Sequence, residues 1–133
     1  MKKTLFSMLS LLLACATGCL ATRSDGEVVE KGRLQIFNPG FASQIEVIRD
    51  QTTNTDSGFL KVQVTLRNTD KRDFTSQYQF IWKDSNGMEL TSAEILWKPL
   101  QLHGREETIV EGICPVPKAA DYRLVLRPLT QPR

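Results

Sequence analysis

The sequence predicts an all-β protein: an immunoglobulin-like antiparallel β-sandwich behind an N-terminal lipoprotein signal peptide and a flexible tether. Beyond residue 32 the apolar residues recur with a period of two, and turn signals separate seven or eight short segments of this kind. A chain of 133 residues has room for one domain. We expect a signal peptide at residues 1–14, a tether at 15–32 and the sandwich at 33–133. A closed small barrel is the alternative architecture.

The first residues form a targeting signal. A short basic head, Met1-Lys2-Lys3, precedes an uncharged apolar run at residues 4–14 (TLFSMLSLLLA). This run is too short to span a bilayer, which takes about 20 residues, and has the length of a signal-peptide core.

A cysteine follows the apolar core directly, as in the lipobox of bacterial lipoproteins. Cys15 is the favoured acylation site because Leu12 lies three positions before it, where the lipobox prefers leucine. Cys19 is the alternative: Gly18 precedes it, but Ala16 occupies the leucine position. An ordinary secretory signal or a Cys15–Cys19 disulfide are the competing interpretations.

The lipobox resemblance also implies a location. Neither residue that follows a candidate cysteine, Ala16 or Leu20, is aspartate. For such lipoproteins this implies sorting to the outer membrane, facing the periplasm. Several acyl chains, palmitate among them, would anchor the protein stably, whereas a single chain binds only marginally.

The tether, from residue 16 to about residue 32, is predicted from small and polar residues with scattered charge. Val28-Val29 is a weak signal that strand pairing begins earlier.

In the domain, residues 59–67 (FLKVQVTLR) alternate strictly and predict a strand with one face in water. Residues 77–83 (QYQFIWK) predict a strand with an aromatic face.

Asp84-Ser85-Asn86-Gly87 predicts a tight hairpin turn, because Asn-Gly supplies positive φ angles, and the returning strand is expected at residues 88–91. No window beyond the signal peptide has a sustained helical face, and residues 118–121 predict one helical turn at most. The remaining strands are predicted at residues 33–37, 44–49, 95–102, 107–114 and 122–127.

Several of these residues resemble the YcfL family of small bacterial lipoproteins. The likeness covers residues 55–128 and the lipobox. It consists of Leu66-Arg67-Asn68-Thr69, the stretch from Tyr78 to Glu89 (YQFIWKDSNGME), Trp97 with Pro99-Leu100, Gly104-Arg105-Glu106, Pro115, Ala119 or Ala120, and Tyr122-Arg123-Leu124. The resemblance implies no activity and no catalytic residues. It implies a location in the cell envelope, because the family's genes often neighbour the gene of a lipoprotein activator of a penicillin-binding protein.

Composition argues against several function classes. With 41% apolar and 24% charged residues the chain is too apolar to be disordered. Once Lys2 and Lys3 leave with the signal peptide, the 17 basic residues fall to 15, equal to the 15 acidic ones. A neutral domain gives no electrostatic case for nucleic acid.

Residues for catalysis or metal binding are scarce. His103, the one histidine, precedes Gly104 in a predicted turn, and Cys114 is expected to be a buried structural thiol; an intermolecular disulfide or a mixed one with Cys19 are alternatives. Residues 84–87 resemble the start of a calcium loop but lack its closing acid. Glu106 and Glu107 are neighbours and would point to opposite faces of a strand. We expect no enzyme activity, no metal and no cofactor.

Three aromatic residues form the candidate ligand surface: Tyr78, Trp82 and Trp97. Exposed, they would stack on sugars such as the peptidoglycan strand; buried, they would belong to the sandwich core, which is the favoured interpretation. The sequence therefore predicts an outer-membrane lipoprotein that acts as a non-catalytic envelope accessory or protein-interaction module, docking an envelope protein through an exposed edge strand. A peptidoglycan-binding domain is the alternative.

Overall fold

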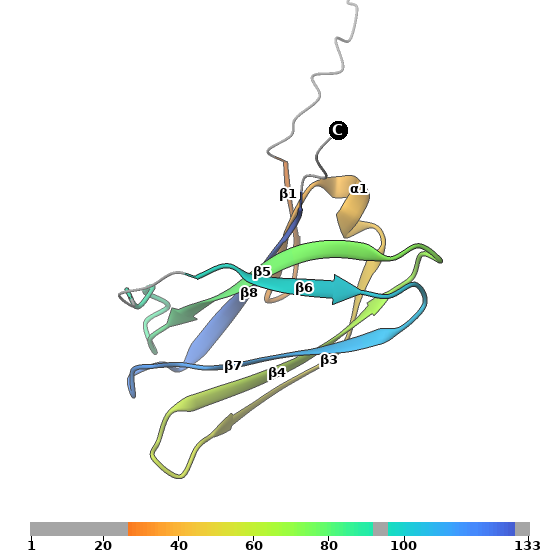
Figure 1. Ribbon diagram of the computed structural model, residues 1–133. Coiled ribbons are helices and arrows are strands. Elements are labelled where there is room, and N and C mark those ends of the chain that lie inside the picture. Colours follow the sequence, from red (N-terminus) through yellow and green to blue (C-terminus); the bar gives the residue numbers. More distant parts are fainter. Residues whose placement is uncertain (1–26, 92–95, 130–133) are drawn as a thin grey trace, which may run out of the picture.

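The computed structural model describes residues 27–91 and 96–129, and Cys15 and Cys19 lie outside this part of the chain. Eight strands and one short helix, α1 (Pro39–Ala42), make up the described fold (Figure 1). The strands are β1 (Val28–Lys31), β2 (Leu34–Phe37), β3 (Ile45–Asn54), β4 (Leu60–Asn68), β5 (Phe74–Lys83), β6 (Lys98–Leu102), β7 (Glu107–Ile113) and β8 (Asp121–Pro128).

The strands form two sheets that pack face to face, which confirms the predicted β-sandwich. One sheet has five strands in the order β1-β2-β8-β5-β6, and the other has three in the order β3-β4-β7. Figure 1 shows β5, β6 and β8 above the layer of β3, β4 and β7. Every pairing is antiparallel except β2 with β8, which run parallel.

The core lies between the sheets and follows the alternation in the sequence. On β4 the predicted apolar face is buried and the polar residues between are only half-buried. Sheets bury one side chain in two when only one face meets a partner layer. The fully buried core side chains include Ile36, Ile45, Val62, Leu66, Leu102, Val110, Leu124 and Leu126.

A polar cluster closes one open side of the sandwich. Arg33, in the β1–β2 turn, donates from Nε to Oδ1 of Asp121 (2.7 Å) and from Nη1 to Oδ2 of Asp50 on β3 (3.1 Å). The Tyr122 hydroxyl donates to the same Asp50 oxygen at 3.0 Å. Burial, followed by the Asp50 carboxylate, raises the pKa of Tyr122, so its hydroxyl remains a donor. The cluster therefore joins β8 of one sheet to β3 of the other.

The sandwich begins earlier in the chain than predicted. Residues 28–31, expected to belong to the tether, form β1, which pairs with β2 in the register Val29↔Ile36. Val29 packs against the core, and the Nζ atom of Lys31 donates to the carbonyls of Ala42 (2.6 Å) and Ile45 (2.7 Å). The weak Val28-Val29 signal therefore marks the first strand, which pairs with the adjacent β2 across the turn at Gly32 and Arg33.

The strand expected at residues 88–91 is wrong, although the turn before it forms. Gly87 has φ +79° and the Asp84 Oδ1 atom accepts from the N–H groups of Asn86 (2.8 Å) and Met88 (3.0 Å). The chain then makes one bridge, Lys83↔Glu89, before leaving the sheet. The Asp84 side chain is thus occupied in closing a turn.

The sequence also did not predict α1. Asn38 is its N-cap, and its side-chain oxygen accepts from the N–H groups of Gly40 (3.0 Å) and Phe41 (3.2 Å), with Pro39 at the first helical position. A helix of four residues has no hydrophobic period to detect.

Candidate functional site

Two of the three predicted aromatic residues face the core. Trp82 is 6% exposed, and its ring stacks on Phe80 with a centroid distance of 5.2 Å. Tyr78, two residues before Phe80 on the same face of β5, is half-buried and meets the Phe80 ring edge-on at 6.0 Å. Both side chains lie between the sheets because β5 turns alternate residues inward.

Trp97 lies on the opposite face of the five-stranded sheet. The Arg127 guanidinium carbon lies 4.0 Å from the centroid of its ring. The Nε and Nη2 atoms of Arg127 both donate to Oε1 of Gln77, at 3.0 and 2.8 Å. Gln77 precedes Tyr78 in β5 and therefore points away from the core. The structure does not bring Tyr78, Trp82 and Trp97 together into one surface.

His103 lies in the turn after β6, beside a carboxylate. Its Nδ1 atom is 3.3 Å from Oδ2 of Asp73, and the Gly104 N–H donates to Oδ1 of Asp73 at 2.8 Å. The Gly104 N–H, and then His103, lower the pKa of Asp73, so that it is ionised at neutral pH. Both side chains are more than half exposed, at 57% and 59%. The pair lies in solvent instead of a cleft that would enclose a substrate.

Cys114, just after β7, is fully buried and free of any disulfide. Burial raises the pKa of its thiol, which disfavours the reactive thiolate.

Within residues 27–91 and 96–129 there is no group of three or more His, Cys, Asp or Glu side chains placed to hold a metal ion. The same part of the chain contains no helix with the length and hydropathy of a membrane span.

A buried asparagine organises the loops at one end of the sandwich. Asn68, the last residue of β4, is fully buried. Its Nδ2 atom donates to the carbonyls of Arg72 (2.7 Å) and Leu102 (3.3 Å), and its Oδ1 atom accepts from the Asp70 N–H (2.9 Å). One side chain thereby holds residues 69–73 against the end of β6.

Gly104 fits into the same loop cluster. A Cβ atom at this position would lie 2.1 Å from the carbonyl oxygen of Lys71, closer than atoms can approach. The Arg105 N–H donates to the Asp70 carbonyl at 2.9 Å. The motif residues Asn68 and Gly104 therefore have structural roles, which bring the β4–β5 and β6–β7 loops together.

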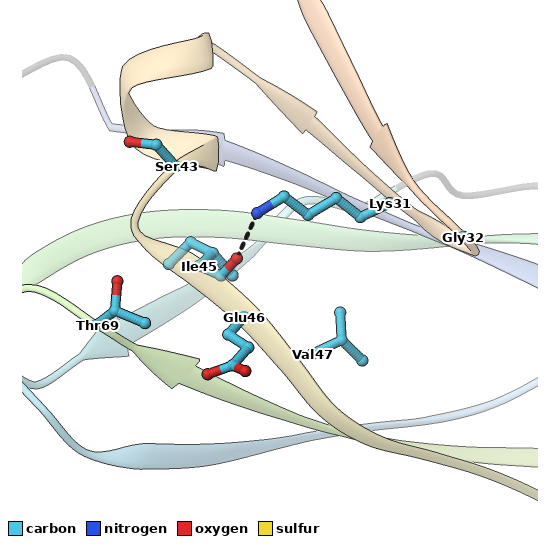
Figure 2. Close-up of a pocket in the computed structure, with 7 residues that line it drawn as sticks. All are labelled: Lys31, Gly32, Ser43, Ile45, Glu46, Val47 and Thr69. Carbon is cyan, nitrogen blue, oxygen red and sulfur yellow. Dashed lines mark hydrogen bonds between the residues drawn. The ribbon is translucent and has the colours of Figure 1, made fainter.

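An open groove of about 700 Å³ runs beside the first part of β3 (Figure 2). It is lined by Lys31, Gly32, Ser43, Ile45, Glu46, Val47 and Thr69. Figure 2 shows the Lys31 side chain reaching across the groove to the Ile45 carbonyl. Ser43 Oγ donates to the Gly40 carbonyl and Thr69 Oγ1 to the Gln44 carbonyl. These polar groups are occupied within the protein, which leaves little to select a ligand.

The sheet edges differ in how they are protected against an added strand. β6 carries Pro99, which lacks an N–H, and β1 has four residues. β3 has a register shift between Val47 and Arg49, and Lys31 caps its Ile45 carbonyl. Short length, proline, lysine and bulges all hinder edge-to-edge pairing.

β7 has no proline, lysine or register shift, and its two charged residues, Glu107 and Glu111, are paired with side chains of β4. Its seven residues pair with β4 in an unbroken register from Lys61↔Ile113 to Arg67↔Glu107, without proline or a register shift. Ile109 and Ile113 are 64% and 52% exposed. The sequence predicts a strand at residues 107–114 and an exposed edge strand, without indicating which strand forms that edge. The alternation of glutamate with isoleucine at positions 107, 109, 111 and 113 was the available signal, because both kinds of residue share one face.

Comparison with known proteins agrees with the fold. A model of the family described as protein of unknown function (DUF1425) matches residues 32–128. The crystal structure of Campylobacter jejuni cj0090 superposes with a TM-score of 0.62 at 20% identity, covering 74% of this chain and 99% of that one. A DUF1425 family member from Shewanella sp. pv-4 superposes with a TM-score of 0.57 at 28% identity, covering 78% of this chain and 90% of that one. No curated protein matches the sequence.

Proposed function

The chain belongs to the DUF1425 family of proteins of unknown function, and from this premise we propose that it is a lipid-anchored binding module of the bacterial cell envelope. In this proposal the chain is cleaved before Cys15, or alternatively before Cys19, and acyl chains hold it in the outer membrane facing the periplasm. The signal-like sequence at residues 1–15 and the resemblance to YcfL lipoproteins support the location.

The domain acts by binding another envelope protein, without catalysis. The observation that carries this proposal is the unprotected β7 edge, because open strand edges accept extended segments of other proteins. The exposure of His103 and the burial of Cys114 support a non-catalytic role, since neither is set in a site that would activate a nucleophile.

Lipid anchoring is tested on the full-length chain expressed in Gram-negative cells. We expect mass spectrometry of the detergent-extracted protein to find acyl chains on Cys15 as the first residue, and density-gradient separation to place it with outer membranes. The Cys15→Ser variant should lose the acyl mass and leave the outer-membrane fraction, while Cys19→Ser should retain both.

The reverse pattern would transfer the anchor to Cys19. An unacylated chain in both single variants and in the wild type would refute the proposed anchor. A non-catalytic role is tested separately with the His103→Ala variant. Cells that carry this variant should have the phenotype of wild-type cells. A phenotype equal to that of a strain without the gene would contradict the non-catalytic role.

A further inference from the structure

The backbone of β7 offers a row of hydrogen-bonding groups to an incoming strand. At the two ends of the β4–β7 ladder, the Cys114 N–H donates to the Leu60 carbonyl (2.8 Å) and the Asn68 N–H donates to the Glu106 carbonyl (3.1 Å). In an antiparallel pair alternate residues turn their backbone groups toward the partner. The even-numbered residues of β7 therefore bond to β4. The N–H and C=O groups of the four odd-numbered residues, Glu107, Ile109, Glu111 and Ile113, point to the free edge.

The side chains of the same four residues cover the outer face of the three-stranded sheet. Glu111 accepts from Lys61 Nζ (2.9 Å) and from Gln63 Nε2 (2.6 Å), and Glu107 is paired with Arg67. Both carboxylates thus have partners on β4, and both remain partly exposed, at 43% and 44%. Ile109 and Ile113 have no such cover and stay more than half exposed.

We propose that β7 is the docking edge for an extended segment of another protein, which adds to the three-stranded sheet as a fourth strand. The segment would carry apolar residues at two positions four apart, opposite Ile109 and Ile113, and a polar or basic residue midway, opposite Glu111. Cross-strand apolar pairs and opposite charges stabilise such a pairing, while main-chain bonds supply most of the affinity. This inference rests on the proposed binding function and names its partner's chemistry.

A second copy of this chain fits the edge poorly. In a two-fold antiparallel pair of β7 strands, the register that sets Ile109 opposite Ile113 of the other copy also sets Glu111 opposite Glu111. The register centred on Ile109 sets Glu107 opposite Glu111. The register centred on Val110 avoids like charges but places each isoleucine opposite a glutamate. Because like charges directly opposite destabilise a pair, self-association is disfavoured.

Amide hydrogen exchange of the folded protein, followed by NMR, tests the edge directly. The probe is a capped seven-residue peptide with valine at positions 2 and 6, lysine at 4 and threonine elsewhere. Near-saturating peptide should slow exchange of the Ile109, Glu111 and Ile113 amides about tenfold and leave the β4-bonded amides of Thr108, Val110 and Gly112 unchanged. A control peptide with serine in place of both valines keeps the main-chain bonds and should slow the same three amides several-fold less at the same concentration.

Protection of the odd-numbered amides that grows with protein concentration alone would instead indicate a second copy and overturn the proposal. Equal slowing along β3 or β6, or none at near-saturating peptide, would overturn it too.

In cells, the full-length chain with photoreactive benzoylphenylalanine at position 113 should give an adduct with another protein. Ile109→Pro removes an outward N–H without removing a bond to β4, so it should abolish the adduct; Ile109→Thr keeps the N–H and should only weaken it. Thr52→Pro, which removes an outward N–H from the β3 edge, is the matched control and should leave the adduct unchanged. Glu111→Pro is a second variant at the β7 edge in case Ile109→Pro does not fold.

The outcomes separate this inference from the proposed function. An adduct that persists in a folded Ile109→Pro or Glu111→Pro variant, or that has the mass of two copies of this chain, overturns the β7 inference alone. A chain that is never anchored, and that forms no adduct from position 113 or from position 53 on β3, refutes the proposed function as well.

Discussion

At the scale of single residues, neighbouring groups determine the pKa of Asp70, in the β4–β5 loop, more than burial does. The Asp70 side chain is 20% exposed, and the side chain and then the backbone N–H of Arg72 lower its pKa from 3.8 to about 2. A folded-state pKa below the unfolded value contributes stability that is present above pH 3.8 and is lost as the pH falls toward about 2.

The Asp70 carboxyl should therefore titrate near pH 2 in a carbon-detected NMR experiment. In the Arg72→Gln variant its pKa should rise, but stay below 3.8 because the backbone N–H at position 72 still donates to it. Glu111 on β7, whose pKa is lowered by hydrogen bonds from Gln63 and then Lys61, provides a reference carboxyl that should not respond to the Arg72 substitution. An unchanged Asp70 pKa in the variant would assign the shift to the backbone alone.

The buried side-chain amide of Asn68 contributes to the stability of the protein through its hydrogen bonds. Replacement by leucine would remove one donor each from the carbonyls of Arg72 and Leu102 and the acceptor of the Asp70 N–H. Unsatisfied buried groups cost about 1–3 kcal/mol each, and part of the loop can reach water, so we expect Asn68→Leu to reduce the free energy of unfolding by about 3 kcal/mol.

Urea unfolding of Asn68→Leu and Asn54→Leu measures this cost. Asn54 is exposed at the end of β3, and its replacement should change the free energy of unfolding by less than about 0.5 kcal/mol. Similar losses in the two variants would mean that the Asn68 hydrogen bonds contribute little to stability.

At the scale of elements, β7 meets the five-stranded sheet through a glycine. A Cβ atom on Gly112 would lie 2.5 Å from Cδ2 of Phe80, so the aromatic ring occupies the space of the missing side chain. Overpacking of this kind costs about 1–3 kcal/mol, and we expect Gly112→Ala to lose that much stability.

The double variant tests whether the Phe80 ring is the cause. Gly112→Ala in a Phe80→Leu background should cost at least about 1 kcal/mol less than in the wild type, as unfolding free energies from a four-member cycle would measure. Additive costs would show that the strain at position 112 has another origin.

The strands also differ in how much of their length could be predicted from the sequence. β4 was predicted almost to its ends because strict alternation reports burial on one face. β3 was predicted to stop at Arg49, yet it continues to Asn54 through residues exposed on both faces. That extension depends on backbone pairing with β4, and backbone pairing leaves no hydrophobic pattern.

The candidate surface was less predictable than the strands. Tyr78 and Trp82 lie on the inner face of the five-stranded sheet, whereas Trp97 stacks on Arg127, an outward-facing residue of β8. That β7 is an edge strand follows from the order of strands in the sheet, a property of the whole fold. The sequence could indicate which residues share the outer face of β7, but not that no neighbour covers its other side.

At the scale of the whole molecule, the start of the domain is set by contacts that cross the sandwich. β1 pairs only with β2, but Val29 packs on the core and Lys31 bonds to two carbonyls beside the other sheet. A chain that begins at residue 27 retains all of these contacts, whereas one that begins at residue 33, the boundary predicted from the sequence, loses them.

We expect the shorter chain to be less stable by about 3 kcal/mol, from the lost burial of Val29 and the two unpaired carbonyls. Urea unfolding of both chains, followed by tryptophan fluorescence of the buried Trp82, measures the difference, and the shorter chain should also have the smaller dependence on denaturant because it buries less surface. A variant that begins at residue 27 and carries Lys31→Met should fall between the two. Equal stability of the two chains would place the start of the folded unit at β2, in which case β1 could detach without cost to the rest of the sandwich.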